Sequence, residues 1–401
     1  MKIAIFYPQP FFASLGTLVR VRELVIGLNK LGNNVTIWSP YEKRAKIWTG
    51  INVEPLSSLL INKFPKLSYR ISSLLYYNSF VSNIFLNKLF SRNITKRFAK
   101  WVRRIINSQP DVLQIEHDIS MLFFGKIQDQ VKLVVDIQNT TLAELVALGI
   151  IKRGSEKYEK LRKRISEALS NADKIIVDGE LLKIYVHKIY DICNKDIIVI
   201  PPLVREKVRT DSIKLRRYPP KICYAGQISY REHVDLFIKS MPEVLNKRED
   251  ANFYITNKGE HLKQIRKLVK KLRINSAYFY WFEKGDDFYK FLSKCHVGVL
   301  PSSNDLARKI GTPIKLFDYM SVGLPIVAND IGAWTDIIKQ HNIGIVVGDD
   351  PKEFANAILD LINDPHLAFE YGSRGLKLVS SLYNLDNSIE RLVHEYKRLI
   401  S

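Results

Sequence analysis

Short apolar runs alternate with amphipathic segments along most of the 401-residue chain. Residues 3–7 form the first such run, and residues 18–31 then carry apolar side chains at a helical spacing that ends before Gly32. Runs that are apolar throughout are typical of strands buried on both faces, as in parallel sheets covered by helices. Further strands are expected at residues 35–39, 112–115, 132–137, 174–177 and 197–200. The pattern therefore predicts an α/β fold.

A second alternating series begins near residue 220, after a polar and basic stretch that indicates a linker. The last helix is expected at residues 388–400, with Asp386 or Asn387 as its N-cap. We therefore predict two doubly wound domains, residues 1–200 and 220–384, joined by a linker at residues 201–219 and followed by a C-terminal helix within residues 385–401. The expected strands of the second domain are 221–225, 252–256, 277–282, 297–301, 325–328 and 344–347, and helices are expected at 234–245, 262–272 and 315–321.

The net charge of +20 is concentrated near the N-terminus. Residues 1–110 hold 17 Lys and Arg against 3 Asp and Glu, and no carboxylate lies between Pro55 and Pro110. A local excess of this kind predicts a positive surface for an anionic partner, which leaves nucleic acid, anionic lipid and a phosphorylated substrate open. No helix-turn-helix or stacking-aromatic signature is present, so nucleic acid is the least favoured partner.

No apolar stretch reaches the roughly 18 residues of a membrane-spanning helix, and residues 2–7 are too short for a signal peptide. These features predict a cytoplasmic protein. Residues 94–106 place apolar side chains on one face and cations around the others, which fits either a core helix or a helix lying on anionic lipid. We predict a peripheral membrane surface on the cytoplasmic face that includes Arg97, Lys100, Trp101 and Arg104.

Metal and nucleophile signatures are weak. The three cysteines are far apart, and no Ser/His/Asp or Cys/His arrangement has a recognisable spacing. Asp178-Gly179-Glu180 has the form of an acidic metal motif, but a strand-to-helix turn with carboxylates at the helix start explains it better. We therefore predict no metal and no cofactor.

Two glycine-containing segments suggest where a ligand would bind. Gly16-Thr17 precedes the first helix, where free backbone N–H groups bind anions, although an ordinary turn explains it as well. In the second domain, Gly226 follows a strand. Residues 311–327 are expected to form a loop, a short helix that contains Lys315 and Asp318, and a glycine turn that leads into a strand. A diphosphate could lie at that helix, with ribose hydroxyls on Asp318.

Lys315-Leu-Phe-Asp-Tyr-Met followed by Gly323-Leu-Pro-Ile-Val resembles the donor-binding signature of glycosyltransferase family 4, a group 1 type family, in its P-x-K-L-F-E-Y-M-A-x-G-x-P form. The resemblance extends over nearly the whole chain. Residues 16–35 are similar to the family's glycine loop and first helix, residues 110–117 to its P-D-V-V-Q-V-E-H segment, and residues 195–202 and 333–350 to later family segments.

The resemblance implies the GT-B fold, two Rossmann-like domains facing a central cleft, with the acceptor on the first domain and the nucleotide sugar on the second. The C-terminal helix, residues 385–401, is then expected to return to the first domain. It also implies a retaining, metal-independent transferase in which cationic side chains stabilise the departing diphosphate. Carried over by position, it implies that Lys315 binds phosphate, that Asp318 binds ribose, and that Glu116 and His117 face the donor sugar. The catalytic prediction is therefore His117, Glu116 and Lys315. The predicted donor-binding residues are Gly16, Thr17, Gly226, Gln227, Arg231, Lys309, Thr312, Ile314, Lys315 and Asp318.

The chain departs from the family pattern where the diphosphate would be clamped. The family has Arg directly after the glycine and Lys five residues later, whereas this chain has Gln227 and Glu232. Our hypothesis is that Arg231 replaces this pair, together with Lys309. The family's first motif glutamate falls on Ile310.

We predict a retaining glycosyltransferase that moves a hexose from a nucleoside diphosphate sugar to a glycan or to a lipid-linked acceptor such as a polyprenyl phosphate or diphosphate glycan. The alternative is a non-catalytic GT-B partner subunit that has lost the phosphate clamp.

Overall fold

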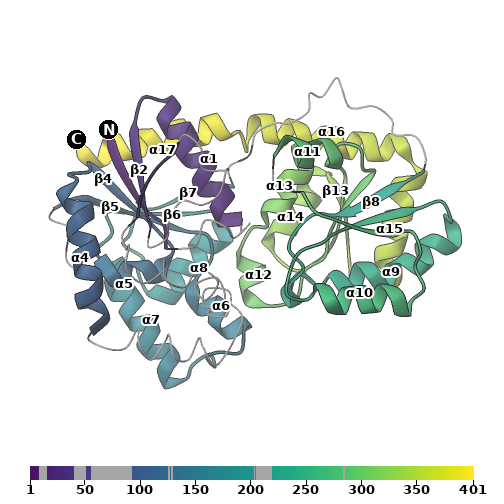
Figure 1. Ribbon diagram of the computed structural model, residues 1–401, viewed down its shortest axis with the longest axis horizontal. Coiled ribbons are helices and arrows are strands. Elements are labelled where there is room, and N and C mark those ends of the chain that lie inside the picture. The colour runs from purple at the N-terminus through teal and green to yellow at the C-terminus, as the bar shows by residue number, and fades with distance from the viewer. Residues whose placement is uncertain are drawn as a thin grey trace. The chain divides into compact units, whose positions relative to one another are not determined.

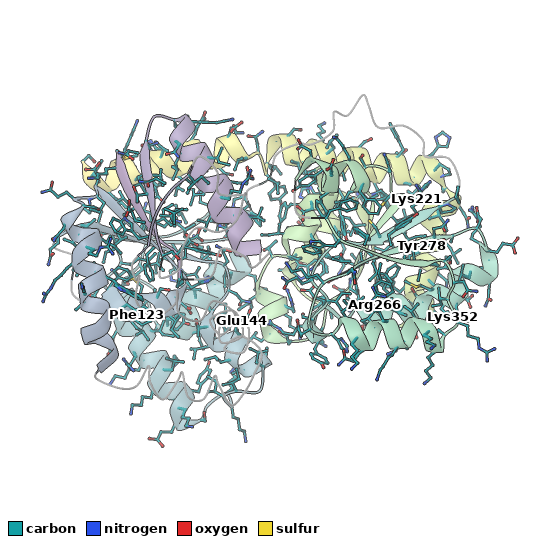
Figure 2. All side chains as sticks on the ribbon, in the orientation of Figure 1. Phe123, Glu144, Lys221, Arg266, Tyr278 and Lys352 are labelled. Carbon is teal, nitrogen blue, oxygen red and sulfur yellow. The ribbon has the colours of Figure 1, made fainter. Side chains whose placement is uncertain are left out.

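The computed structural model describes residues 1–8, 16–39, 51–55, 93–124, 127, 130–202, 204, 219–282 and 285–401 of the chain (Figure 1). Figure 2 shows the side chains on the same ribbon. The chain divides into two compact units. The first comprises Met1–Pro201 together with Asp386–Ser401, and the second comprises Pro202–Leu385.

The first unit contains a parallel sheet whose described strands have the order β3-β2-β1-β4-β5-β6-β7. The central strands are buried on both faces, as their continuous Val, Ile and Leu runs require. The strands are β1 (Lys2–Phe6), β2 (Asn34–Ser39), β3 (Asn52–Pro55), β4 (Val112–Glu116), β5 (Lys132–Ile137), β6 (Lys174–Val177) and β7 (Ile197–Val199). The helices are α1 (Gly16–Lys30), α4 (Asn93–Asn107), α5 (Met121–Phe124), α6 (Thr141–Ala147), α7 (Glu156–Leu169), α8 (Glu180–Tyr190) and α17 (Leu385–Ile400).

The helix α17 comes last in the chain and packs in the first unit. Its residues Ile389, Leu392 and Tyr396 are buried. The helix α1 has Gly27 at the contact, where a Cβ atom would lie 2.7 Å from Ile389 Cγ1, so only glycine allows this approach. The start of α17 was predicted three residues too late, because this helix already begins at Leu385. Asp386 consequently lies in the first turn, where its charge favours the helix dipole, and not at the N-cap.

The second unit repeats this architecture with the strand order β10-β9-β8-β11-β12-β13, again all parallel. Its strands are β8 (Lys221–Tyr224), β9 (Asn252–Thr256), β10 (Ala277–Tyr280), β11 (Val297–Leu300), β12 (Ile326–Asn329) and β13 (Gly344–Val347). Its helices are α9 (Val234–Lys247), α10 (Leu262–Lys271), α11 (Asp286–Leu292), α12 (Leu306–Ile310), α13 (Ile314–Met320), α14 (Ala333–His341), α15 (Pro351–Asn363) and α16 (Pro365–Ser381).

Apolar side chains cover both faces of this second sheet. Ile222, Phe253 and Val299 belong to one buried cluster, together with residues of α9 and α15. Leu300 belongs to another, together with Tyr319 and other residues of α13 and α14. The prediction of two doubly wound parallel-sheet domains is thus confirmed, and the ends of the predicted strands agree with the observed ones to within two residues. The edge strand β3 was not predicted.

The predicted linker lies mostly outside the described residues. Within residues 201–219, the structure describes 201, 202, 204 and 219. Val204 forms a parallel bridge with Asn384 and so belongs to the second unit.

Candidate functional site

In both sheets the strand order reverses once, between β1 and β4 in the first unit and between β8 and β11 in the second. Ligands of doubly wound sheets bind beyond the carboxyl ends of the strands at such a reversal. In the second unit this place is lined by the segment after β8, which includes Gly226 and the short 3-10 helix Tyr230–Glu232, and by α12 and α13 after β11.

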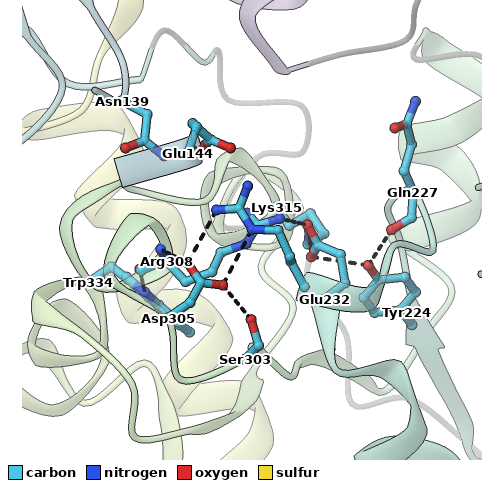
Figure 3. A network of polar contacts seen from close by, with 11 residues as sticks. Asn139, Glu144, Tyr224, Gln227, Glu232, Ser303, Asp305, Arg308, Lys315 and Trp334 are labelled. Carbon is cyan, nitrogen blue, oxygen red and sulfur yellow. Dashed lines mark hydrogen bonds and ion pairs between the residues drawn. The ribbon is translucent and has the colours of Figure 1, made fainter. Parts of the chain in front are cut away.

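Glu232 is the centre of a polar cluster at this reversal (Figure 3). Its side chain is buried, and its two carboxylate oxygens form ion pairs with different cations, Oε1 with Arg308 and Oε2 with Lys315. Tyr224 Oη lies 3.2 Å from Glu232 Oε2 and 2.8 Å from the backbone oxygen of Gln227. The four side chains come from the strand β8, the 3-10 helix, α12 and α13. We call Tyr224, Glu232, Arg308 and Lys315 the Glu232 cluster.

The Glu232 carboxyl stays ionised at every physiological pH. Burial alone raises its pKa, but the charges of Arg308 and Lys315 outweigh burial and lower the pKa to about 2. The pKa of Tyr224 is raised by burial and by the Glu232 charge, so its phenol remains a hydrogen-bond donor. The cluster is therefore a pair of cations sharing one fixed anion.

Gly226 makes room for Lys315. A Cβ atom on Gly226 would lie 2.5 Å from Lys315 Cδ and 3.1 Å from its Nζ, so the lysine chain runs directly over the glycine. The ammonium group also lies 5.5 Å from the centre of the Tyr224 ring, where a cation is attracted to the ring face. The backbone N–H of Gly226 is held by Thr256 Oγ1 at 2.9 Å. The structure thus brings together two predicted site residues, Gly226 and Lys315.

Arg231 is bound to a neighbouring carboxylate. Its Nε and Nη2 donate to Asp305 at 3.3 Å. Asp305 also accepts from Ser303 Oγ and caps α12 through the backbone N–H of Arg308. The pKa of Asp305 is lowered because Arg231 and these hydrogen bonds outweigh the effect of burial. The hypothesis that Arg231 replaces the family's clamp stays a prediction. A phosphate that binds Arg231 would have to compete with the carboxylate of Asp305.

The other predicted donor-binding residues of this unit differ in burial. Lys309 is exposed at the end of α12, whereas Thr312 and Ile314 are half-buried in the turn after it and at the start of α13. Asp318 is buried on α13, and its Oδ1 accepts a hydrogen bond from Tyr289 Oη at 2.9 Å. Their roles toward a donor stay predictions.

In the first unit, Glu116 lies inside a buried polar network. Gln114 Nε2 donates to its Oε1 at 2.7 Å and Gln138 Nε2 to its Oε2 at 3.2 Å. Burial and the nearby Asp136 charge raise the pKa of Glu116 well above its usual value. Asp136 itself is paired with Arg20 at 3.0 Å. Glu116 is therefore part of the core of this unit, and its predicted catalytic role stays a prediction.

His117 follows Glu116 at the carboxyl end of β4, where the strand order reverses. Its backbone has φ 69°, a left-handed conformation that costs free energy for a residue with a side chain. Burial lowers the pKa of the imidazole to about 4, so it is neutral at physiological pH. A neutral imidazole can donate and accept hydrogen bonds, as a group facing a sugar would need.

The predicted membrane surface is described in part. On α4, Lys100 and Arg104 are exposed and Trp101 is half-buried, whereas the side chain of Arg97 lies outside the described residues. Arg104 stacks on the ring of Trp38 at 5.8 Å. At the start of α1, the side chain of Thr17 and the surroundings of Gly16 also lie outside the described part. No helix within the described ranges is both long enough and apolar enough to cross a membrane.

The acidic segment near residue 178 is a strand-to-helix turn, with Gly179 at the N-cap of α8 and Glu180 in its first turn. In the described part of the chain, no group of three or more His, Cys, Asp or Glu side chains is arranged to hold a metal ion.

Sequence reasoning missed the partnership of Arg308 with Glu232. It also missed the contact of Trp334, whose Nε1 donates to the backbone oxygen of Arg308 at 3.1 Å. The sequence did hold a signal for the ion pair, because Glu232 stands where the family has lysine, and a buried carboxylate needs cations beside it.

The sequence of the second unit matches a known family. Residues 219–364 match the model of the glycosyl transferases of group 1. An uncharacterized glycosyltransferase of Methanocaldococcus jannaschii is 26% identical over 178 residues, which is 44% of each chain. A GDP-mannose-dependent mannosyltransferase of Corynebacterium glutamicum that acts on a monoacylated phosphatidylinositol monomannoside is 22% identical over 180 residues, 44% of this chain and 46% of the relative. The matches span less than half the length of these relatives.

Solved structures match the whole chain in fold. Sucrose-phosphate synthase from Thermosynechococcus elongatus has a TM-score of 0.70 at 15% identity, covering 99% of this chain and 98% of its own. A glycosyltransferase from Rickettsia africae has a TM-score of 0.72 at 13% identity, with 100% and 98% covered. Residues 219–364 of this chain are therefore similar to the group 1 glycosyltransferases, and the chain has the GT-B fold of the solved structures.

Proposed function

We propose that the protein is a glycosyltransferase that uses a nucleoside diphosphate sugar as donor and transfers a hexose with retention of configuration. The observation that carries this proposal is the Glu232 cluster, because it places two cations at the strand-order reversal of the unit that matches the family. A reversal of this kind with fixed cations suits an anionic leaving group.

The proposed chemistry needs little from the protein beyond position and charge. The acceptor hydroxyl oxygen bonds to the anomeric carbon on the face from which the diphosphate leaves. The bond from that carbon to the diphosphate oxygen breaks, and this oxygen takes the acceptor's proton. Lys315 stabilises the charge that develops on the leaving group, so no metal is required.

We further propose a lipid-linked or glycan acceptor on the first unit, with peripheral binding to anionic lipid. Support comes from the exposed cations of α4, Lys100, Arg103 and Arg104, and from the acceptor of the Corynebacterium relative, which is a phospholipid glycoside by its name. A polyprenyl phosphate or diphosphate glycan has the same combination of anionic head and apolar tail.

A donor screen tests the proposal. UDP-, GDP- and dTDP-sugars are added to the purified protein, and the melting temperature is measured. One nucleotide class is expected to raise it, since a ligand that binds the native state stabilises it by mass action. Transfer with that donor is then followed with and without EDTA, and the anomeric configuration of the product is determined. An unchanged melting temperature with every donor, loss of turnover in EDTA, or an inverted product would contradict the proposal.

The alternative, a non-catalytic GT-B partner subunit, is favoured by one observation. The carboxylate of Glu232 cancels one of the two positive charges beside it. Donor binding without hydrolysis or transfer to any tested acceptor would support this alternative.

A further inference from the structure

The Glu232 cluster contains a buried donor that needs a partner. Arg308 uses its Nη2 to bind Glu232, but its Nε is buried and has no hydrogen-bond partner among the described residues. Buried N–H groups of native proteins are almost always satisfied, so an orphan of this kind at a strand-order reversal points to a ligand. An oxygen of a phosphate group would bind at the exposed part of this guanidinium.

Arg308 is anchored so that its guanidinium is presented at one place. Asp305 Oδ1 accepts from its backbone N–H at 3.0 Å, and Trp334 Nε1 donates to its backbone oxygen at 3.1 Å. The side chain keeps 27% of its surface exposed, so a ligand can reach it. A planar guanidinium with a fixed backbone suits recognition of phosphate oxygens.

Glu232 keeps Arg308 and Lys315 together. Two neighbouring cations repel each other, and the carboxylate between them removes this repulsion while its two oxygens fix where each cation lies. Its exposed fraction is 7%, and its pKa of about 2 keeps it charged. A buried carboxylate with partners on three other elements is costly to displace, so it stays in place when a ligand arrives.

We propose that Arg308 is a diphosphate-binding residue of this chain and that Glu232 is a positioning residue that aligns Arg308 and Lys315 for the donor. The two cations thus come from positions 308 and 315, in place of the Arg and Lys that the family has at positions 227 and 232. This inference rests on the proposed function and assigns the residues that carry it out.

The test measures binding of the free nucleoside diphosphates UDP, GDP and dTDP by isothermal titration calorimetry. The nucleotide that binds wild type is then titrated into Arg308→Gln, Arg308→Lys, Glu232→Gln, Glu232→Asp, Arg231→Gln and the double variant Arg308→Gln/Glu232→Gln. The matched controls are Arg374→Gln and Glu370→Gln, which remove an exposed ion pair of 2.9 Å on α16 of the same unit. Circular dichroism and the melting temperature confirm that each variant is folded.

Arg308→Gln is expected to raise the Kd at least tenfold, and Arg308→Lys to recover part of this loss because it keeps the charge. The controls should change the Kd less than twofold. An affinity of Arg308→Gln equal to wild type, or a loss seen in Arg231→Gln instead, would overturn the assignment of Arg308.

The sign of the Glu232→Gln effect decides the role of Glu232. If Glu232 only neutralised the site, its removal would tighten the binding of an anion. A positioning role predicts weaker binding, by about fivefold or more, with partial rescue in Glu232→Asp and a much smaller effect when Arg308 is already Gln. Tighter or unchanged binding by Glu232→Gln, or equal effects in both backgrounds, would overturn the positioning role.

Failure of the proposed function gives a different result. Wild type would then bind none of the nucleoside diphosphates and none of their sugars, and both proposals would fall. Binding by wild type with no effect of the Arg308 and Glu232 variants would remove this inference alone.

Discussion

Gly226→Ala should displace the side chain of Lys315 from the Glu232 cluster without unfolding the protein. The new methyl group would lie 2.5 Å from Lys315 Cδ, 3.1 Å from Nζ and 3.2 Å from Cε, closer than carbon atoms approach each other. The three nearest atoms all belong to one flexible side chain, so the lysine moves and the backbone does not have to. The substitution is thus a way of displacing Lys315 while its charge is kept.

The size of the effect follows from the geometry. Lys315 must move by about 1 Å to reach an ordinary carbon contact of about 3.5 Å. Such a movement removes most of its charge-assisted hydrogen bond to Glu232, and an interaction of this class is worth about 1.5–3 kcal/mol. The same displacement removes the ammonium from the proposed phosphate position, which predicts a Kd for nucleoside diphosphate about 10- to 100-fold higher.

The assay is calorimetric titration of the nucleotide into Gly226→Ala, with Gly375→Ala as the matched control. Gly375 lies on α16 of the same unit, and a Cβ atom there would meet Met320 at an ordinary 3.4 Å. Gly375→Ala is expected to bind like wild type and to be at least as stable, because alanine favours a helix over glycine by about 1 kcal/mol.

Wild-type affinity in Gly226→Ala would refute the reasoning, because it would mean that the position of Lys315 over the glycine does not matter for the ligand. A fold that collapses in Gly226→Ala would refute it as well, since only a flexible side chain stands in the way.

Three further predictions concern stability, each measured by urea unfolding followed by circular dichroism. The pKa of Glu232 is about 2 in the folded protein and 4.5 in the free residue. Its ionised form therefore contributes about 3 kcal/mol to the free energy of unfolding above pH 4.5, and this contribution is lost as the pH falls toward 2. Wild type should therefore lose more stability than Glu232→Gln between pH 5 and 3, and parallel curves would contradict this. Tyr396→Phe should lower the free energy of unfolding by about 1–3 kcal/mol, because it leaves the buried Oε1 of Gln114 without its donor. An unchanged urea midpoint would contradict this. Gly344→Ala should lower the free energy of unfolding by several kcal/mol, because its Cβ would lie 2.1 Å from the backbone oxygen of Ile326. Near wild-type stability would contradict the close pairing of β12 and β13.

Most of the fold could be predicted from the sequence because its strands are short, mainly apolar runs. The runs at β5, β6, β9 and β13 have the predicted limits, since each is bounded by polar or glycine residues. The start of α17 was missed because Leu385 precedes the polar Asp386 and Asn387, a pair that has the form of an N-cap. A single buried leucine at the helix start is too little pattern to outweigh that signal.

The candidate site was predictable in part for a different reason. Lys315 and Gly226 stand in motifs, and the structure brings them together across the chain. Arg308 stands in no motif, and its pairing with Glu232 joins residues 76 positions apart. Spacing along the sequence carries no information about such a pair, whereas charge balance does, because a buried carboxylate requires a cation.

The place of α17 has a consequence for how damage to the coding sequence would act. Its Tyr396 and Glu395 reach Gln114 and Lys174 in the interior of the first unit. A premature stop codon just before Asp386 would leave the second unit fully translated. It would nevertheless remove α17 from the first unit. A late truncation would therefore destabilise the half of the molecule that the ribosome makes first.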